Sequence, residues 1–433
     1  MKNIFKKIVI SIITWQSRLV LKKYKPKIIA ITGSVGKTST KDAIYTVLSQ
    51  FVYVRKIDKS YDADIAVPLT ILGLGNGWNN PFLWIANILE GFMLLIKKNI
   101  YPEYLILELG ADRPGAIKNI TKWISPDVVI ITRLPDVPVH VEAFPNVDAV
   151  IEEKRALAES VKKDGILILN FDDTKVMELK EKIKVKTINF GMNSGAMLQA
   201  SNEELWYENK ENQKQIKGMN FKLEYDGNAL PVSVSNIVGI NHVYAALGAL
   251  SVAYALNLNM IDSIQSMKNY ITPPGRLHLL SGIKGSLIID DSYNSSPVAC
   301  ESALITLKNI EVTGRRIAIL GDMLELGKHT LAEHEKIGEI TKDYCDILIT
   351  VGVRAEHMYE GAMRAGFPKQ NLFHLDEAQQ AGLFIQNNIL PGDLILIKGS
   401  QGMRMERTVL ELMANPEDFE TLLVRQDKEW LNR

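Results

Sequence analysis

A short apolar run that leads directly into a glycine loop and then a helical pattern constrains the fold of this chain most. The run is Ile28–Thr32, and the loop after it reads Gly33-Ser34-Val35-Gly36-Lys37-Thr38-Ser39. Short buried strands that alternate with helices indicate parallel sheets with helical crossovers, so we expect an α/β protein. Similar apolar runs recur at Tyr104–Leu109, Val128–Thr132, Ile166–Asn170, Ser286–Ile289, Ile317–Leu320, Ile347–Val351 and Leu394–Ile397.

The glycine loop has the composition of a phosphate-binding loop. Glycines let backbone N–H groups approach phosphate oxygens, and the N-terminus of the following helix adds partial positive charge. Lys37 can reach terminal phosphates, and the Thr38 hydroxyl can ligate Mg²⁺. Because Ile31 stands where longer loops of this kind have a glycine, the loop is the shorter TGxxGKT variety. A glycine turn with a chance Gly-Lys-Thr is the alternative. The residues expected at the phosphates of a nucleotide are Gly33, Ser34, Gly36, Lys37, Thr38 and Ser39.

Composition narrows the class of protein. The chain has 433 residues, 46% of them hydrophobic, which is enough for two or three domains. Its 50 basic and 50 acidic residues balance, so we expect no nucleic-acid partner. Two isolated cysteines, Cys300 and Cys345, form neither a zinc site nor a disulfide framework and fit a reducing cytoplasm.

Changes in residue pattern and the positions of turn-forming residues suggest that the chain has three parts. Residues 189–235 alternate polar and apolar side chains between glycines and asparagines, which predicts antiparallel strands, and a helical stretch at about Asn241–Leu256 follows. The run Thr272-Pro-Pro-Gly275 then indicates a domain boundary. We therefore expect an N-terminal helix over residues 1–26, a central domain over 27–274 and a C-terminal domain over 275–433.

Residues 1–27 hold eight basic residues and no acid around an apolar run, Ile8–Trp15. That run is too short to span a bilayer, which needs about 20 residues, and no cleavage site of a signal peptide follows it. One interpretation is a basic amphipathic helix that lies on an anionic membrane surface. The other is a helix that packs on the next domain with its lysines in water. Residues 77–100 form a second apolar stretch, which could be a core helix, a partner face or another membrane contact.

Further motifs follow the glycine loop in a recognisable order. They are ITGSVGKTSTKDAI (31–44), LELGADRPGAI (107–117), ITRLPDVPVHVEAF (131–144), EEKRAL (152–157), LILNFDD (167–173), PPGRLHLL (273–280), IIDDSYNSSP (288–297), AILGDMLELG (318–327) and ILIKGSQGMRMERTV (395–409). Together they resemble the Mur ligases over about residues 27–415. The resemblance implies a central P-loop ATPase domain with a mostly parallel sheet and a Rossmann-like C-terminal α/β domain. The last two motifs are most similar to the family member that adds D-alanyl-D-alanine to a peptidoglycan precursor.

Such a ligase activates a carboxylate as an acyl phosphate with ATP, so catalysis consists mainly of positioning and neutralising phosphate charge. By resemblance, Thr38 and Glu108 hold one Mg²⁺, while His140 and a carbamylated Lys154 hold a second, with Lys37 at the phosphates. Each has a plainer alternative: a solvated strand end for Glu108, a loop histidine for His140, and a solvated helix face for Lys154, which stands among charged neighbours.

The C-terminal motifs imply further contacts. Arg276 resembles the arginine that touches the γ-phosphate. The acids Asp290 and Asp291, with Asn294, resemble the group that holds the ATP ribose, and a strand-end turn is the alternative. Lys398 and Ser400 follow an apolar strand, where open α/β sheets place ligands. They resemble residues that position the incoming amine substrate, and a structural loop is the alternative there.

We therefore expect an ATP- and Mg²⁺-dependent ligase of peptidoglycan biosynthesis that acts on a muropeptide precursor and D-Ala-D-Ala, as a cytoplasmic monomer with peripheral contact to the inner membrane surface through residues 1–26. The family usually opens with a UDP-binding domain, whereas about 26 residues precede the first strand here. A lipid-linked or other non-UDP acceptor, another cell-wall peptide, a polyglutamate and a non-catalytic scaffold are the alternatives. Separated cysteines argue against the amidating relative with a four-cysteine zinc ribbon.

Two segments depart from the family pattern. Asp62 stands where the family tends to have Asn, and we interpret it as a residue near the metals. Asn241-His242 and Ala245 replace residues that help to hold adenine, so the mode of adenine recognition stays open.

Overall fold

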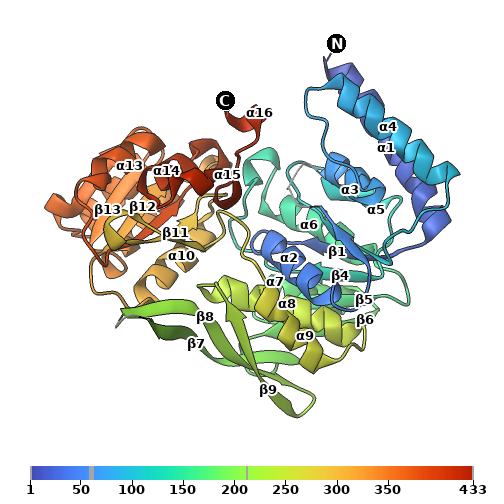
Figure 1. The fold of residues 1–433 in the computed structure, drawn as a ribbon, viewed down its shortest axis with the longest axis horizontal. Helices are drawn as coiled ribbons and strands as arrows, with labels where there is room; N and C mark the ends of the chain where they lie inside the picture. The colour runs from blue at the N-terminus through green and yellow to red at the C-terminus, as the bar shows by residue number, and fades with distance from the viewer. Residues whose placement is uncertain (1, 58–62, 211–212, 432–433) are drawn as a thin grey trace.

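The computed structural model describes residues 2–57, 63–210 and 213–431, so Asp62 lies outside the described residues. The chain forms two α/β units, each a sheet with helices packed on it, and the two units lie side by side (Figure 1). The first sheet has the strand order β2-β3-β1-β4-β5-β6-β7-β8-β9. Its strands are β1 (Lys27–Thr32), β2 (Val54–Lys56), β3 (Tyr104–Glu108), β4 (Val128–Ile131), β5 (Ile166–Asn170), β6 (Lys186–Gly191), β7 (Leu198–Lys210), β8 (Gln213–Tyr225) and β9 (Asn228–Ser235).

This sheet is parallel from β2 to β7, and β7, β8 and β9 pair antiparallel. The predicted antiparallel segment is therefore confirmed, except that its first residues belong to the parallel strand β6. The helical stretch after it is α8 (Ile240–Ala255), also as predicted. The mixed α/β class expected from the alternating apolar runs is thereby confirmed.

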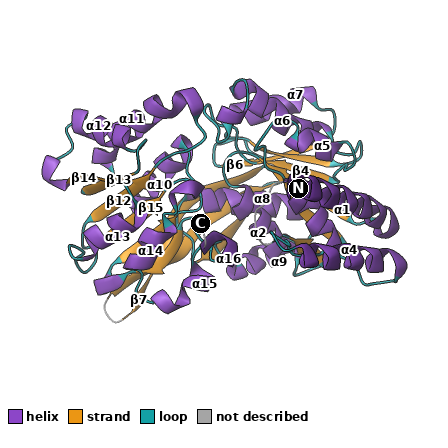
Figure 2. Ribbon diagram, turned by 90° about the horizontal axis from the view of Figure 1, so that it is seen from above, coloured by secondary structure: helices purple, strands orange, loops and turns teal. Residues whose placement is uncertain are grey.

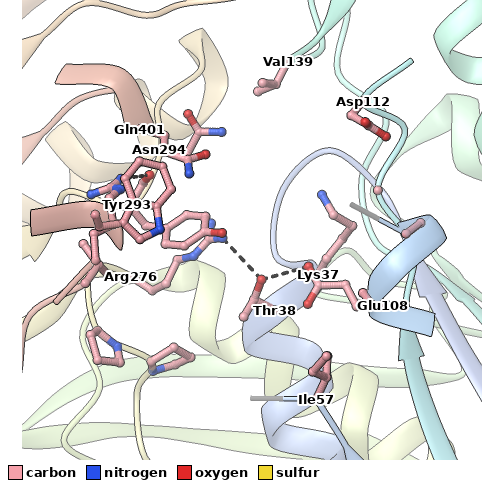
Figure 3. Close-up of a pocket in the computed structure, with 18 of the residues that line it drawn as sticks. Lys37, Thr38, Ile57, Glu108, Asp112, Val139, Arg276, Tyr293, Asn294 and Gln401 are labelled. Carbon is pink, nitrogen blue, oxygen red and sulfur yellow. Dashed lines mark hydrogen bonds between the residues drawn. The ribbon is translucent and has the colours of Figure 1, made fainter. Parts of the chain in front are cut away.

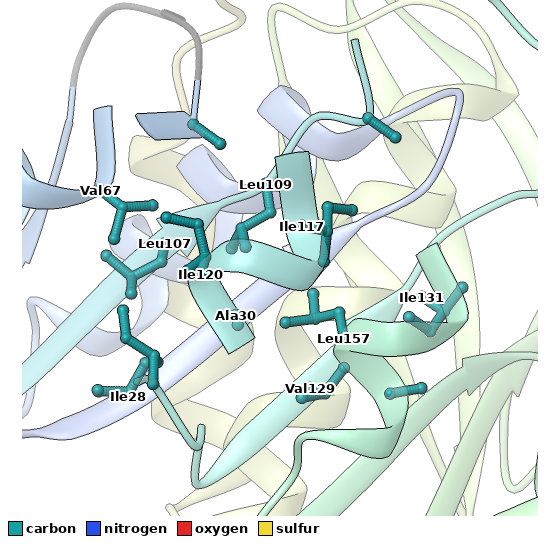
Figure 4. Packing of buried hydrophobic residues seen from close by; sticks show 14 of the residues in the cluster. Ile28, Ala30, Val67, Leu107, Leu109, Ile117, Ile120, Val129, Ile131 and Leu157 are labelled. Carbon is teal, nitrogen blue, oxygen red and sulfur yellow. The ribbon is translucent and has the colours of Figure 1, made fainter. Parts of the chain in front are cut away.

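Helices cover both faces of the first sheet because its central strands are apolar on both sides. In β1, Ile28 and Ala30 pack into one core, and Ile29 and Ile31 pack into the other. Figure 4 shows the first of these cores, where Ile28 and Ala30 lie with side chains from helices and neighbouring strands. Its helices are α3 (Ala63–Leu72), α5 (Ala116–Thr121), α6 (Val147–Glu159) and α7 (Thr174–Lys182), whereas α2 (Lys37–Leu48), α8 and α9 (Met260–Ser266) cover the opposite face.

The second sheet has the order β10-β11-β15-β12-β13-β14 and is parallel except for β10. Helices again cover both faces, in two separate cores. Its strands are β10 (His278–Ser281), β11 (Leu287–Asp291), β12 (Arg316–Gly321), β13 (Ile347–Val351), β14 (Leu372–Leu375) and β15 (Leu394–Lys398). Its helices are α10 (Pro297–Asn309), α11 (Thr330–Ile340), α12 (Glu356–Arg364), α13 (Ala378–Gln386), α14 (Glu406–Leu412), α15 (Phe419–Leu422) and α16 (Lys428–Leu431).

The chain passes from the first sheet to the second between Tyr270 and His278. We place the boundary of the proposed central and C-terminal domains there, and we call them the first and the second domain. The three-part division stays a proposal. The crossing segment contains Arg276, so the residue expected at the γ-phosphate lies where the two sheets meet.

Helix α1 (Lys2–Tyr24) packs against the first domain and lies beside α4 (Pro81–Ile96) (Figure 2). Its Val9, Ile13 and Val20 are buried in the same core as α3. The face of α1 that carries these residues therefore agrees with the interpretation of residues 1–26 as a helix packed on the next domain. Among the described residues, no helix is long and apolar enough to cross a bilayer.

The contact between α1 and α4 depends on a glycine. Gln16 of α1 is fully buried and donates from Nε2 to Ile88 O at 2.8 Å, directly against Gly91 of α4. A Cβ at Gly91 would overlap the carboxamide of Gln16. This close approach of the Gln16 carboxamide to the α4 backbone explains why α4 has a glycine in its interior, where it costs helix propensity.

We expect Gly91→Val to destabilise the fold by about 1–3 kcal/mol, because the added methyl groups displace a buried carboxamide that cannot move without losing its hydrogen bond. Urea unfolding measures this difference. Ala86→Val is the matched control, since Ala86 is an exposed position of the same helix, and it should stay within about 0.5 kcal/mol of the parent. Equal midpoints for the two variants would contradict the tight α1–α4 contact.

Candidate active site

The glycine loop connects the end of β1 to the start of α2. Gly33 has φ 147° and lies so close to Thr132 that a Cβ would collide with its hydroxyl. Gly36 has φ 84° and caps α2 without a side-chain hydrogen bond. The first N–H groups of a helix have no partner inside the helix, so α2 presents donors and partial positive charge to the loop. This is the geometry that binds phosphate.

Lys37 lies inside this loop. Its Nζ donates to Gly33 O at 2.9 Å. Burial lowers the pKa of Lys37 below its ordinary value; Glu108 opposes this shift, and the charge of Arg276 adds to it. The lysine is thus held over the loop, beside a carboxylate that can compensate its charge.

Glu108, the last residue of β3, is the centre of a charged cluster. Its Oε1 accepts from the Thr38 hydroxyl at 2.9 Å, and Arg276 Nη2 donates to the same hydroxyl oxygen at 3.3 Å. Figure 3 shows these two interactions, with Arg276 reaching Thr38 from the segment that connects the two sheets. Burial by itself raises the pKa of Glu108, but the cations Lys41, Lys37 and Arg276 outweigh it and hold the pKa below its ordinary value.

Lys41 was not among the predicted site residues. It is fully buried, its Nζ lies 3.6 Å from Glu108 Oε2, and it also donates to Ile57 O at 2.9 Å. Its position one helical turn after Lys37 was the available signal, because residues four apart share a helix face.

His140 and Lys154 line the same cleft as the glycine loop. His140 has a left-handed backbone, φ 70°, and its Nδ1 lies 2.6 Å from Glu325 Oε2 in the loop after β12. Glu325 belongs to the GDMLELG motif but was not predicted to pair with His140. This half-exposed contact connects the two domains.

Lys154 does not lie on a solvated helix face. It is buried, and its two charged neighbours have other partners. Glu153 accepts from Ile117 N at 2.8 Å and from Lys118 N at 2.9 Å. Arg155 pairs with Glu159 at the surface. Burial, with repulsion from Lys37, lowers the pKa of Lys154 to about 7, and Glu153 opposes this. The side chain can therefore be a neutral amine at neutral pH.

The structure distributes the predicted C-terminal residues between the cleft and the core. Asp291, Asn294 and Lys398 line the cleft. Lys398 is nevertheless only 2% exposed, because its Nζ lies 2.6 Å from Asp291 Oδ2 and donates to Asn294 O at 3.0 Å. The lysine therefore positions two cleft residues.

Asp290 and Ser400 are not brought to the cleft. Asp290 is fully buried, accepts from Ser292 N at 3.0 Å, and has its pKa raised to about 6 by burial. The Ser400 hydroxyl accepts from Leu324 N at 2.8 Å and fixes the loop after β12. Their neighbours Tyr293 and Gln401 line the cleft instead, and the Tyr293 ring centre lies 4.0 Å from the guanidinium carbon of Arg276.

The cleft has a volume of about 1470 Å³ and takes its walls from both domains, from α1 and from the C-terminal segment. Two family profiles match parts of both domains that line this cleft. A profile of the Mur ligase middle domain matches residues 31–253, more than half of the chain, and one described as "Mur ligase, glutamate ligase domain" matches residues 275–401. The chain belongs to the Mur ligase family.

Two curated relatives named UDP-N-acetylmuramoyl-tripeptide–D-alanyl-D-alanine ligase are similar to this Mur ligase over most of its length. The protein from Bacillus subtilis is 26% identical over 92% of this chain and 78% of its own. The protein from Escherichia coli K12 is 26% identical over 90% and 77%. A crystal structure of MurF ligase from Thermotoga maritima in complex with ADP has a TM-score of 0.74 at 24% identity, and covers 93% of this chain and 82% of that one, which shows the shared fold.

The altered Asn241-His242 pair has separate positions in this Mur ligase. Asn241 lines the cleft. His242 is buried, and its Nε2 lies 2.8 Å from Arg276 O, where it can donate to that carbonyl. Burial lowers the pKa of His242 to about 4, so the ring is neutral at physiological pH. The histidine thus fixes the backbone of the interdomain arginine.

We expect Glu108→Gln to lower Mg²⁺-dependent ATP turnover by roughly 100-fold or more, because a neutral amide can compensate neither the cation nor Lys37. Steady-state turnover against Mg²⁺ concentration measures this. Glu103→Gln is the matched control: Glu103 is exposed just before the same strand, and this variant should behave as the parent. A Glu108→Gln enzyme with the parental Mg²⁺ response would contradict the expected role of Glu108 as a metal ligand.

Proposed function

We propose that this chain is an ATP-dependent, ADP-forming ligase that adds D-Ala-D-Ala to the peptide carboxylate of a muropeptide precursor in peptidoglycan synthesis, acting as a monomer. The observation that carries the proposal is the meeting of Lys37, Thr38 and Glu108 with Arg276 of the interdomain segment in one cleft. The names of these two curated relatives support the two substrates.

The chemistry requires a good leaving group on a carboxylate. The carboxylate oxygen attacks the γ-phosphorus of ATP, the bond to the bridging oxygen breaks, and ADP leaves with its electron pair. The amine then attacks the acyl phosphate carbon, inorganic phosphate leaves, and the amine proton is released. Because both steps move negative charge among phosphate oxygens, positioned cations and N–H donors lower both barriers.

The chain supplies these groups from two sides. We assign the N-terminal N–H groups of α2 and Lys37 to the β- and γ-phosphates. Arg276 approaches from the opposite wall, with its guanidinium stacked near Tyr293, and we assign it to the transferred phosphoryl group. We assign Asp291 and Asn294, which Lys398 positions, to the ATP ribose.

The residues around Glu108 fit a divalent cation. Glu108 Oε2 is buried and has no hydrogen-bond partner, and the Thr38 hydroxyl is bonded to the other oxygen of the same carboxylate. Hard oxygen ligands of this kind suit Mg²⁺. When bound, Mg²⁺ neutralises charge on the β- and γ-phosphates. We assign Thr38 and Glu108 to this ion.

We assign His140 and a carbamylated Lys154 to a second ion. A lysine reacts with CO₂ only as the neutral amine, forming an N–C bond and releasing a proton. An ordinary lysine, with a pKa near 10.4, is neutral in roughly one molecule in 2500 at pH 7. Burial of Lys154 in a pocket that already holds Lys37 favours the neutral amine, and the carbamate would replace a buried cation with oxygen ligands.

The protein equilibrated with ¹³C-bicarbonate should therefore give one carbamate carbonyl resonance that Lys154→Gln removes. Lys163→Gln is the matched control, since Lys163 is exposed shortly after α6, and it should keep the resonance. Lys154→Ala should lose ligation, and added propionate should restore part of it by supplying a carboxylate. An active enzyme without the resonance would contradict carbamylation.

Of the predicted residues for the amine substrate, Lys398 and Ser400 act through others in our proposal. Lys398 holds Asp291 and Asn294, and Ser400 fixes the loop after β12. Gln401, which lines the cleft, is the neighbour placed to meet the substrate directly. A scaffold without catalysis is disfavoured, because it would have no use for buried, mutually compensating charges at a phosphate loop.

Phosphate release from ATP and Mg²⁺ tests the function, with D-Ala-D-Ala and a UDP-muramoyl-tripeptide each omitted in turn. We expect release only with both substrates, loss of release in Lys37→Ala, and a dipeptide-sized mass increase in the product. Lys328→Ala, an exposed lysine of the second domain, is the control. Release that needs neither substrate, or a product without the added dipeptide, would overturn the proposed reaction.

A further inference from the structure

Helix α4 exposes an apolar stripe that nothing in the described chain covers. Its most exposed members are Phe82, Ile85, Leu89 and Ile96, which are 79%, 52%, 60% and 78% exposed. Their spacings of three, four and seven residues place them on one helix face, together with Phe92 and Met93. Only Trp84 and Gly91 of this helix are buried. Figures 1 and 2 both show α4 at the outer edge of the molecule.

The stripe continues onto α1. The Trp15 ring lies 6.1 Å from that of Phe92, and Phe5, Ile8 and Trp15 are about half exposed. We call this surface the α1–α4 face; its members are Phe5, Ile8, Trp15, Phe82, Ile85, Leu89, Phe92, Met93 and Ile96. Contiguous exposed apolar surfaces of this kind mark interaction sites.

The charge around the α1–α4 face is predominantly positive. Helix α1 has no acidic residue, and Glu90 is the single acid of α4. Exposed basic side chains stand on the same two helices or directly after them, and we call them the basic rim: Lys6, Lys7, Arg18, Lys22, Lys23, Lys25, Lys97 and Lys98. Apolar side chains with a basic rim match a bilayer surface that carries anionic headgroups.

We propose that the α1–α4 face docks on the surface of a bilayer that contains anionic lipids. Neither helix is suited to cross a bilayer, so the contact lies in the plane of the interface. A second copy of the chain is a poorer occupant. A two-fold dimer would place this face against itself and bring two basic rims together, which is electrostatically unfavourable.

The docking face and the cleft share the same two helices. Phe5, Lys6, Val9 and Ile10 of α1 and Trp84 of α4 line the cleft. Docking therefore brings one wall of the cleft close to the lipid surface, within reach of an acceptor anchored in the bilayer. This consequence for the acceptor rests on the proposed function, whereas the docking itself does not.

Co-sedimentation of the full chain with vesicles tests the docking. Vesicles of phosphatidylcholine with an equal part of phosphatidylglycerol should bind the protein, and added salt should weaken the binding. The double variant Leu89→Glu/Ile96→Glu should bind at least tenfold more weakly, because it places two carboxylates in the stripe. Lys22→Glu/Lys98→Glu should weaken binding and remove most of its salt dependence.

Leu331→Glu/Leu383→Glu is the matched control, since these leucines of the second domain are 50% and 49% exposed, and it should bind as the parent. Each variant is also assayed for ligation of soluble substrates, which should stay at the parental rate. Equal vesicle binding by the α4 variant, or a parental dimer in light scattering that this variant dissociates, would overturn the docking. If the parent protein binds vesicles but does not ligate the soluble substrates, the result would instead count against the proposed function.

Discussion

The compensation of charge around Glu108 determines how this site can exist. A carboxylate buried at the end of β3 would ordinarily be too costly to ionise. Here Lys41, Lys37 and Arg276 surround it, and their combined field holds its pKa below the ordinary value. The same arrangement makes the buried lysines tolerable. The cations come from α2 and from the interdomain segment. The cluster therefore forms only when β3, α2 and the interdomain segment are correctly positioned relative to one another.

Contacts across the cleft give the two domains a defined relation. Arg276 reaches Thr38 from the crossing segment, and His242 fixes the Arg276 backbone from α8. On the other side, His140 pairs with Glu325 of the second domain. These contacts join the two domains at the same residues and motifs that the sequence assigned to the site, so the arrangement of the domains also determines which groups meet in the cleft.

Much of this follows from local sequence. Periodicity and the Gly33–Ser39 loop predicted parallel sheets with a phosphate loop between β1 and α2, because such signals depend on neighbours in the chain. Motif order indicated Glu108, His140, Lys154 and Arg276, and the structure brings all four to one cleft. The antiparallel character of β8 and β9 was also readable, since it depends on alternation within each strand.

Only the tertiary structure decided which polar residues face the cleft and which serve the core. Asp290 and Asp291 are adjacent in sequence, yet strand alternation sends one inward and the other to Lys398. Lys154 has charged neighbours, but helix geometry buries it while Arg155 stays at the surface. The exposed stripe of α4 reads as a core helix, because composition records how apolar a segment is but not whether another segment covers it. The sequence by itself determined the elements and their chemistry; burial and partner choice needed distant segments to meet.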